Sequence, residues 1–138
     1  MFAAKLDSLT RSSTPRPRIA VVDDERAYVC ASMLVLGDEF DVVACEDASE
    51  LLGRLHGGER FDLILADVNM PAMSGFQFFG RLRELDRSQA DRVYFLTGDP
   101  DARSIPRDLE WRVVGKPSMG DELRSFVVEK LSRRRPAR

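Results

Sequence analysis

Short apolar runs alternate with segments of helical spacing along most of the chain, and no other feature of the sequence constrains the fold as strongly. The apolar runs are rich in β-branched residues and end in turn residues, a pattern typical of buried strands. Apolar residues at three- and four-residue intervals predict the helices between them. We expect strands at 18–22, 41–45, 63–66, 92–96 and 111–114, and helices at 27–36, 49–55, 76–85 and 123–131.

The segment between Thr97 and Lys116 departs from this pattern. It contains Pro100 and Pro106 and few apolar residues, so we expect the fourth helix to be short or irregular. Other helix starts are marked by a capping residue with a polar partner three positions later. This spacing predicts N-caps at Asp47, Ser74 and Ser118.

Strands that alternate with helices form a parallel sheet through crossover connections, which are almost always right-handed. The predicted architecture is therefore an α/β fold: a doubly wound, five-stranded parallel sheet with helices on both faces. In such sheets, ligands bind beyond the carboxyl ends of the strands, where the strand order reverses. The residues that follow the strands are the first candidates for a functional site.

The composition predicts a single domain. The chain has 138 residues, of which 43% are hydrophobic, and this is enough apolar material for one core. The stretches RSSTPRPR and SRRRPAR have neither helical nor strand spacing. We expect a flexible arm at 1–17, a domain at 18–132 and a basic tail at 133–138, which leaves no room for a DNA-binding domain. The formal net charge of -2 gives no general attraction to nucleic acid.

The sequence contains no signal for a membrane or for export. No apolar run approaches the roughly 18 residues of a membrane span, and the start MFAAKLDSLTRSS lacks the apolar centre of a secretory signal. We therefore expect a cytoplasmic protein without membrane contact. Cys30 and Cys45 lie in different predicted elements without CxxC spacing, so we expect two free thiols buried in the core.

Polar side chains follow four of the five predicted strands. Asp23 and Asp24 come after the first strand, Asp67 after the third, Thr97 after the fourth and Lys116 after the fifth. Converging carboxylates repel, at a cost of roughly 4 kcal/mol for a pair about 4 Å apart at an effective dielectric near 20. A hard cation offsets this repulsion, and Mg²⁺ combines a few carboxylates with waters and phosphoryl oxygens. The cluster predicts a site for Mg²⁺, or for Mn²⁺, that serves phosphoryl chemistry.

Asp67 is the candidate nucleophile of this site. It lies in the middle of the predicted sheet edge, and a carboxylate that attacks a phosphoryl group forms an acyl phosphate. Lys116 and Thr97 can bind phosphoryl oxygens, the first as a charge and the second as a hydroxyl donor. In the stretch ILADVNMPAMSG, Pro71 and Gly75 shape the turn from Asp67 into the third helix.

Four motifs make the sequence resemble the receiver domain of two-component response regulators, the phospho-acceptor module that includes the chemotaxis regulator. These motifs are IAVVDDE, LILADVNMPAMSG, VYFLTGD and VVGKP, and they span nearly all of residues 18–132. The resemblance implies a flavodoxin-like sheet with the strand order 2-1-3-4-5. The ending VVGKPS is similar to receivers that stand alone or belong to hybrid kinases.

The resemblance also implies which residues hold the phosphoryl group and the metal. Asp67 looks like the phosphorylated aspartate. Asp23 and Asp24 look like the acidic pair that holds Mg²⁺ together with Asp67 and the backbone carbonyl of Asn69.

Further roles follow for the last two strands. Thr97 resembles the switch hydroxyl, and Lys116 resembles the phosphate-binding lysine, followed by Pro117 in what the family usually makes a cis peptide bond. The family often has an aromatic switch residue three positions before the lysine, where this chain has Val113, with Trp111 two residues earlier.

The leading hypothesis is a phosphorelay receiver whose only catalysis is its own phosphorylation and dephosphorylation. A sensor histidine kinase or a histidine phosphotransfer protein would pass a phosphoryl group from phosphohistidine to Asp67, and phosphorylation would switch a protein-interaction surface. One alternative is a receiver-like interaction domain that works without phosphorylation. Another is an aspartyl-phosphate phosphatase, although phosphatases of the haloacid dehalogenase type usually carry DxDx[TV], whereas Val68 and Asn69 follow Asp67 here.

Overall fold

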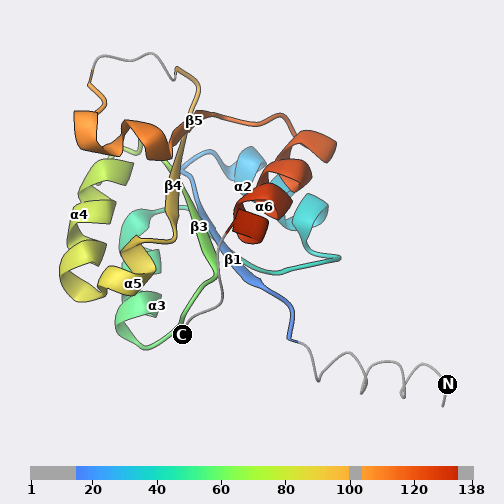
Figure 1. Cartoon of the computed structure of the whole chain (residues 1–138), viewed down its shortest axis with the longest axis horizontal. Coiled ribbons are helices and arrows are strands. Elements are labelled where there is room, and N and C mark those ends of the chain that lie inside the picture. The colour runs from blue at the N-terminus through green and yellow to red at the C-terminus, as the bar shows by residue number, and fades with distance from the viewer. Residues whose placement is uncertain (1–14, 100–103, 134–138) are drawn as a thin grey trace, which may run out of the picture.

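The computed structural model describes residues 15–99 and 104–133, which form a three-layered α/β fold (Figure 1). Five parallel strands form one sheet in the order β2-β1-β3-β4-β5, so the predicted architecture and strand order are confirmed. The strands are β1 Arg18–Val22, β2 Asp41–Cys45, β3 Leu63–Asp67, β4 Val93–Thr97 and β5 Val113–Gly115.

Helices cover both faces of the sheet (Figure 1). One face carries α2 Arg26–Leu36 and α6 Asp121–Arg133, and the other carries α3 Ala48–His56, α4 Gly75–Leu85 and α5 Arg87–Ala90. Because successive residues of a strand point to opposite faces, each strand contributes to two cores. In β3, for example, Leu63 and Leu65 pack on the side of α2 and α6, whereas Ile64 and Ala66 pack on the other side.

The core between the sheet and α4 is aromatic. The Phe95 ring lies 4.8 Å from the Phe76 ring and 5.6 Å from the Phe79 ring, both in edge-to-face geometry, and Phe78 is fully buried beside them. Such aromatic pairs add to the stabilisation that comes from buried area. They fix α4 against β4 and so place the first residue of α4 close to the end of β3.

The predicted element boundaries agree with the structure to within one or two residues, with one exception. The four-residue helix α5 was not predicted. The expected irregular segment after β4 contains the 3₁₀ helix η1 Arg107–Arg112. Residues 100–103 of that segment, and most of the predicted arm and tail, lie outside the described residues. No helix among the described residues is long and apolar enough to cross a membrane.

Two of the three predicted N-caps are confirmed. The Asp47 carboxylate accepts a hydrogen bond from the Glu50 backbone N–H, and Ser74 and Gln77 form a complete capping box. The prediction for Ser118 is wrong, because its backbone N–H instead donates to Glu122 and α6 begins at Asp121. The chain reaches that start through Gly120, whose φ of 89° is a conformation that glycine adopts without a steric penalty.

Both cysteines are free thiols, as predicted, but only one of them is buried. Cys45 is buried at the end of β2, but Cys30 is exposed on the outer face of α2. The buried side of this helix is formed by Val29, Ser32 and Leu36, and position 30 points away from it.

Candidate functional site

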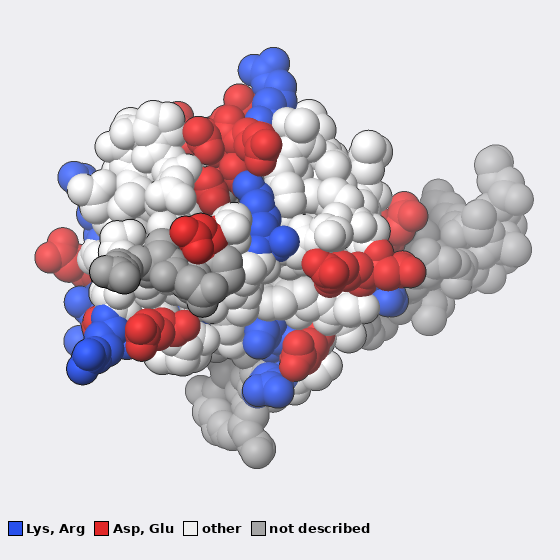
Figure 2. Space-filling model, turned by 90° about the horizontal axis from the view of Figure 1, so that it is seen from above, with Lys and Arg blue, Asp and Glu red and all other residues white. Residues whose placement is uncertain are grey.

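The polar residues that follow the strands meet at one edge of the sheet. Asp23 directly follows β1, Asp67 ends β3, Thr97 ends β4 and Lys116 directly follows β5. Since the strands are parallel, their carboxyl ends lie at the same edge. Figure 2 looks onto this edge and shows acidic side chains gathered in one patch, with basic side chains beside it.

Three carboxylates form the acidic cluster of the site. Ligand oxygens of Asp23, Asp24 and Asp67 all lie within 4.8 Å of one another. Asp23 and Asp67 are 2% and 8% exposed, whereas Asp24 is open to solvent. Hard oxygen donors that are buried on one side and open on the other suit Mg²⁺, which keeps several of its waters. The donor set therefore fits the metal that the sequence predicts.

The ammonium group of Lys116 lies against this cluster. Its Nζ is 2.6 Å from Asp23 Oδ2, 3.2 Å from Glu25 Oε1 and 4.0 Å from Asp67 Oδ1. Burial lowers the pKa of Lys116, but the hydrogen bond and the charge of Asp23 more than offset this, so the pKa is raised. Lys116 therefore stays protonated and places a positive charge 4.0 Å from the carboxylate of the candidate nucleophile, Asp67.

The surroundings of Asp67 disfavour the ionised form of its carboxyl group. Burial and the negative charge of Asp23 raise the pKa of Asp67 to about 6, and Lys116 offsets only part of this. Its ionised form would gain from a further positive charge in the cluster. This is the electrostatic condition under which a divalent cation or a phosphoryl group with its counter-ion binds.

Thr97 is buried at the end of β4, next to the strand that carries Asp67. Its hydroxyl oxygen accepts a hydrogen bond of 3.1 Å from the backbone N–H of Asp99, and its carbonyl accepts one of 2.7 Å from the backbone N–H of Lys116. The second bond ties the end of β4 to the residue that follows β5. The positions of Thr97 and Lys116 are thus linked through the backbone.

Gly75 has a steric role at the site. As the first residue of α4 it donates a backbone hydrogen bond of 3.0 Å to Val68 O. A Cβ atom at Gly75 would lie 2.5 Å from the carbonyl oxygen of Asp67, a distance that real Cβ atoms do not reach. From the sequence, Gly75 was expected only to shape a turn. The structure shows that a glycine here lets α4 begin against the backbone of the candidate nucleophile.

Two residues of the site were not singled out from the sequence. Glu25 forms an ion pair with Lys116, and the Lys116 Nζ lies 4.3 Å from the centre of the Tyr28 ring. Glu25 stands next to the DD pair, which was the available signal. For Tyr28 the signal was its place four residues after Asp24, in the first turn of α2.

Asn69 and Pro117 complete the predicted set. Asn69 is exposed, two residues after Asp67. The expectation of a cis peptide bond between Lys116 and Pro117 is wrong, because this bond is trans in the structure. The Pro117 carbonyl accepts a hydrogen bond of 3.1 Å from the Tyr28 hydroxyl.

The aromatic residues near β5 lie at the outer edge of the sheet. Val113 is partly buried and packs against the same core as Phe95. Trp111 is 64% exposed and meets the Tyr94 ring edge to face at 6.4 Å. Position 113, where the family that this sequence resembles often has an aromatic switch residue, is therefore an aliphatic core contact in this chain.

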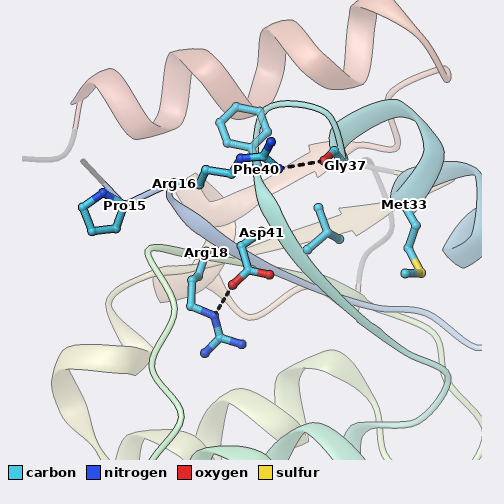
Figure 3. A pocket seen from close by; sticks show the side chains of 8 residues that line it. Pro15, Arg16, Arg18, Met33, Gly37, Phe40 and Asp41 are labelled. Atoms are coloured by element: carbon cyan, nitrogen blue, oxygen red, sulfur yellow. Dashed lines mark hydrogen bonds and ion pairs between the residues drawn. The ribbon is translucent and has the colours of Figure 1, made fainter. Parts of the chain in front are cut away.

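A pocket of about 500 Å³ lies at the opposite edge of the sheet, where β1 and β2 begin (Figure 3). Arg18 pairs with Asp41 across it at 2.9 Å, and the Arg16 guanidinium donates to Gly37 O at 3.1 Å. None of the clustered carboxylates lines this pocket. The carboxylate cluster is therefore separated from this pocket by the length of the strands.

Mg²⁺ is expected to raise the unfolding temperature of the chain, because a ligand that binds only the native state stabilises it by about 2.7 kcal/mol at 100 times its dissociation constant. Asp24→Asn should lose most of this rise in unfolding temperature, since it removes the negative charge of one metal-binding carboxylate without disturbing a buried contact. Thermal unfolding in EDTA and in Mg²⁺ measures the effect. Asp38→Asn, at an exposed position after α2, is the matched control and should keep the full increment. Equal increments in the two variants would contradict the predicted metal site.

Known proteins resemble this chain over most of its length. The family model described as the response regulator receiver domain matches residues 19–127. Among curated proteins, the response regulator protein FleR of Pseudomonas aeruginosa is 37% identical over 70 residues, which are 48% of this chain and 14% of that protein. The chain spans only 14% and 28% of the lengths of the curated relatives it matches.

Solved structures extend the comparison to three dimensions. The chemotaxis protein CheY4 of Vibrio cholerae is 26% identical with a TM-score of 0.67, and the match covers 83% of this chain and 98% of that one. The response regulator protein TrrA of Thermotoga maritima, solved in complex with Mg²⁺-BeF, is 27% identical with a TM-score of 0.63 and the same coverage of 83% and 98%.

Proposed function

Because this chain belongs to the family of response regulator receiver domains, we propose that it is a phosphorelay receiver whose Asp67 accepts a phosphoryl group. The observation that carries the proposal is the meeting of three carboxylates with Lys116 at the carboxyl edge of the sheet. The domain itself would extend over residues 18–132. Its partners would be a sensor histidine kinase or a histidine phosphotransfer protein on the donor side and a target protein on the output side.

The transfer step follows from the chemistry of the residues present. A carboxylate oxygen of Asp67 attacks the phosphorus of a phosphohistidine in line with the leaving nitrogen. The phosphorus–oxygen bond forms as the phosphorus–nitrogen bond breaks, and the imidazole keeps the bonding electron pair. The product is an aspartyl phosphate, so the chain is a reactant in its own modification and not an enzyme for an external substrate.

The remaining residues of the site would bind and orient the transferred group. Asp23, Asp24, Asp67 and the backbone carbonyl of Asn69 would hold Mg²⁺, which when bound supplies positive charge for the phosphoryl oxygens. Lys116 would neutralise one phosphoryl oxygen as a point charge. The Thr97 hydroxyl, which accepts from the Asp99 backbone N–H, would donate to another, and its movement toward that oxygen would carry the change to the output surface.

Intact mass after incubation with Mg²⁺ and phosphoramidate tests the proposal. The native chain is expected to gain one phosphoryl group, because phosphoramidate presents the same phosphorus–nitrogen bond. Asp67→Asn is expected to gain none, since an amide oxygen is a far weaker nucleophile than a carboxylate. Asp38→Asn, with its carboxylate away from the site, is the control and should react like the native chain. EDTA should also prevent the adduct.

The opposite outcome has a definite meaning. If the folded native chain binds Mg²⁺ but gains no phosphoryl group, the receiver proposal is wrong and a phosphorylation-independent interaction domain is supported. If the adduct also forms on Asp67→Asn, another residue accepts the group. Steady hydrolysis of an external phosphoester that depends on Asp67 would instead support the phosphatase alternative.

A further inference from the structure

Tyr28 makes two separate contacts to the loop that carries Lys116. Its ring lies under the ammonium group, with Nζ 4.3 Å from the ring centre, and its hydroxyl donates to the Pro117 carbonyl at 3.1 Å. One side chain of α2 thus holds both the charge and the backbone of the segment that follows β5. Nothing in the transfer step described above uses Tyr28.

We propose that Tyr28 is a positioning residue for Lys116: its ring and its hydroxyl hold the ammonium group where it meets a phosphoryl oxygen on Asp67. This proposal rests on the proposed receiver function. It concerns the rate of phosphoryl acceptance and not the identity of the acceptor.

Support from Tyr28 adds to the ion pairs of Lys116, because the strand that precedes this lysine is short. Lys116 follows the three-residue strand β5, which lies at the edge of the sheet and pairs only with β4. A lysine side chain also loses considerable rotamer entropy when it is held in one conformation. A contact that restrains the side chain before the reaction therefore lowers the barrier to binding the transferred group.

The anionic partners of Lys116 cannot supply this restraint throughout the reaction. Its closest partner is Asp23, at 2.6 Å, and Asp23 is also one of the three carboxylates of the metal cluster. Glu25, the second partner, is 66% exposed, so its ion pair is screened by solvent. An aromatic ring attracts a cation through its face without carrying a charge, so it does not compete for Mg²⁺. Tyr28 is therefore the partner that can hold Lys116 while the metal is bound.

Two substitutions separate the two contacts. Tyr28→Phe keeps the ring and removes the hydrogen bond to Pro117, whereas Tyr28→Leu removes both and keeps apolar bulk. The readout is the second-order rate constant of phosphorylation by phosphoramidate in saturating Mg²⁺. We expect a fall of about tenfold for Tyr28→Leu and of about two- to threefold for Tyr28→Phe, in line with the strength of a partly desolvated cation–π contact.

The chain offers a matched control in Tyr94, its only other tyrosine. Tyr94 is also partly buried against the core, and its ring has Lys130 Nζ at 5.0 Å from its centre. Tyr94→Leu therefore removes a similar packing contact and a similar ammonium–ring contact away from the carboxylates. It should leave the rate constant unchanged. An equal fall for Tyr94→Leu and Tyr28→Leu would show that the effect comes from packing alone, and would overturn the proposal.

A double substitution provides a readout that packing does not affect. In the Lys116→Ala background, Tyr28→Leu should cause no further fall in rate, because the residue through which it acts is gone. A further tenfold fall in that background would overturn the proposal. If Lys116→Ala accepts no measurable phosphoryl group, the single variants decide. The proposal then requires that the rate constant falls from the native chain to Tyr28→Phe and again to Tyr28→Leu, while Tyr94→Leu keeps the native rate constant. Equal rates for native chain and Tyr28→Leu refute only the role of Tyr28, whereas a native chain without any adduct refutes the receiver function itself.

Discussion

Asp67→Asn is expected to raise the free energy of unfolding of the metal-free chain by about 2 kcal/mol near pH 7.5, because the native state holds this carboxylate under unfavourable conditions. Burial and the charge of Asp23 raise the pKa of Asp67 to about 6 in the folded chain. In the unfolded chain the pKa is that of an ordinary aspartate, about 3.9. The asparagine keeps the shape of the side chain and removes the charge.

The sign of the pH dependence follows from these two values. The folded state binds the Asp67 proton more tightly than the unfolded state does. The contribution of this proton to the free energy of unfolding is therefore fully present below about pH 4 and is lost as the pH rises through about 6. The native chain should therefore lose stability over this range relative to Asp67→Asn. The two should be nearly equal close to pH 4. Urea titrations in EDTA at several pH values measure the difference.

Mg²⁺ should reverse the ranking of these two proteins. Because the cation offsets the repulsion among the carboxylates, it is expected to stabilise the native chain more than Asp67→Asn. If Asp67→Asn is no more stable than the native chain in EDTA near pH 7.5, the carboxylate is not destabilised as described. In that case the site does not depend on a cation for its electrostatic balance.

Gly75→Ala is expected to lower the free energy of unfolding by about 1–3 kcal/mol and to slow phosphoryl acceptance, since the added methyl group overpacks a rigid site. Its Cβ would lie 2.5 Å from the Asp67 carbonyl oxygen and 3.2 Å from the Val68 Cα, which are both backbone atoms. No side-chain rotation can relieve this contact. Either the start of α4 moves or the backbone of Asp67 moves, and the second change displaces the proposed nucleophile.

The same helix contains the control for this substitution. Gly80 lies in the middle of α4, and a Cβ there would meet no heavy atom within 4 Å. Gly80→Ala is expected to be neutral or to stabilise by up to about 1 kcal/mol, because alanine is the better helix former. Urea denaturation and the phosphoramidate rate constant give both comparisons. A Gly75→Ala protein as stable and as reactive as Gly80→Ala would contradict the steric role of Gly75.

The sheet and most of its helices follow from the sequence because their patterns are local. The strand 18–22 was predicted to the residue, since its apolar run is bounded by Pro17 on one side and by the acidic pair on the other. The capping box at Ser74 lies within four residues of sequence and needs no tertiary information. The polar residues at the strand ends were found for a related reason, because a parallel sheet brings every carboxyl end to one edge.

The remaining features depend on contacts between distant segments. The short helix α5 and the 3₁₀ helix η1 have no long apolar period, and buried Arg112 joins them through hydrogen bonds to the Ala90 and Val93 carbonyls. The exposure of Cys30 depends on which side of α2 meets the sheet. The contact between Tyr28 and Lys116 joins α2 to the loop after β5, and no local pattern encodes it.

The order of the strands also determines when the site can exist during folding. The ion pair between Glu25 and Lys116 joins residues 91 positions apart, and β1 must pair with β3 although α2, β2 and α3 lie between them in the sequence. Closing such long loops costs chain entropy before any contact repays it, so pairings of this kind form late in folding. A partly folded chain therefore contains Asp67 but lacks the neighbours that the proposed reaction requires. Under the proposed function, acceptance of a phosphoryl group would therefore report completed folding.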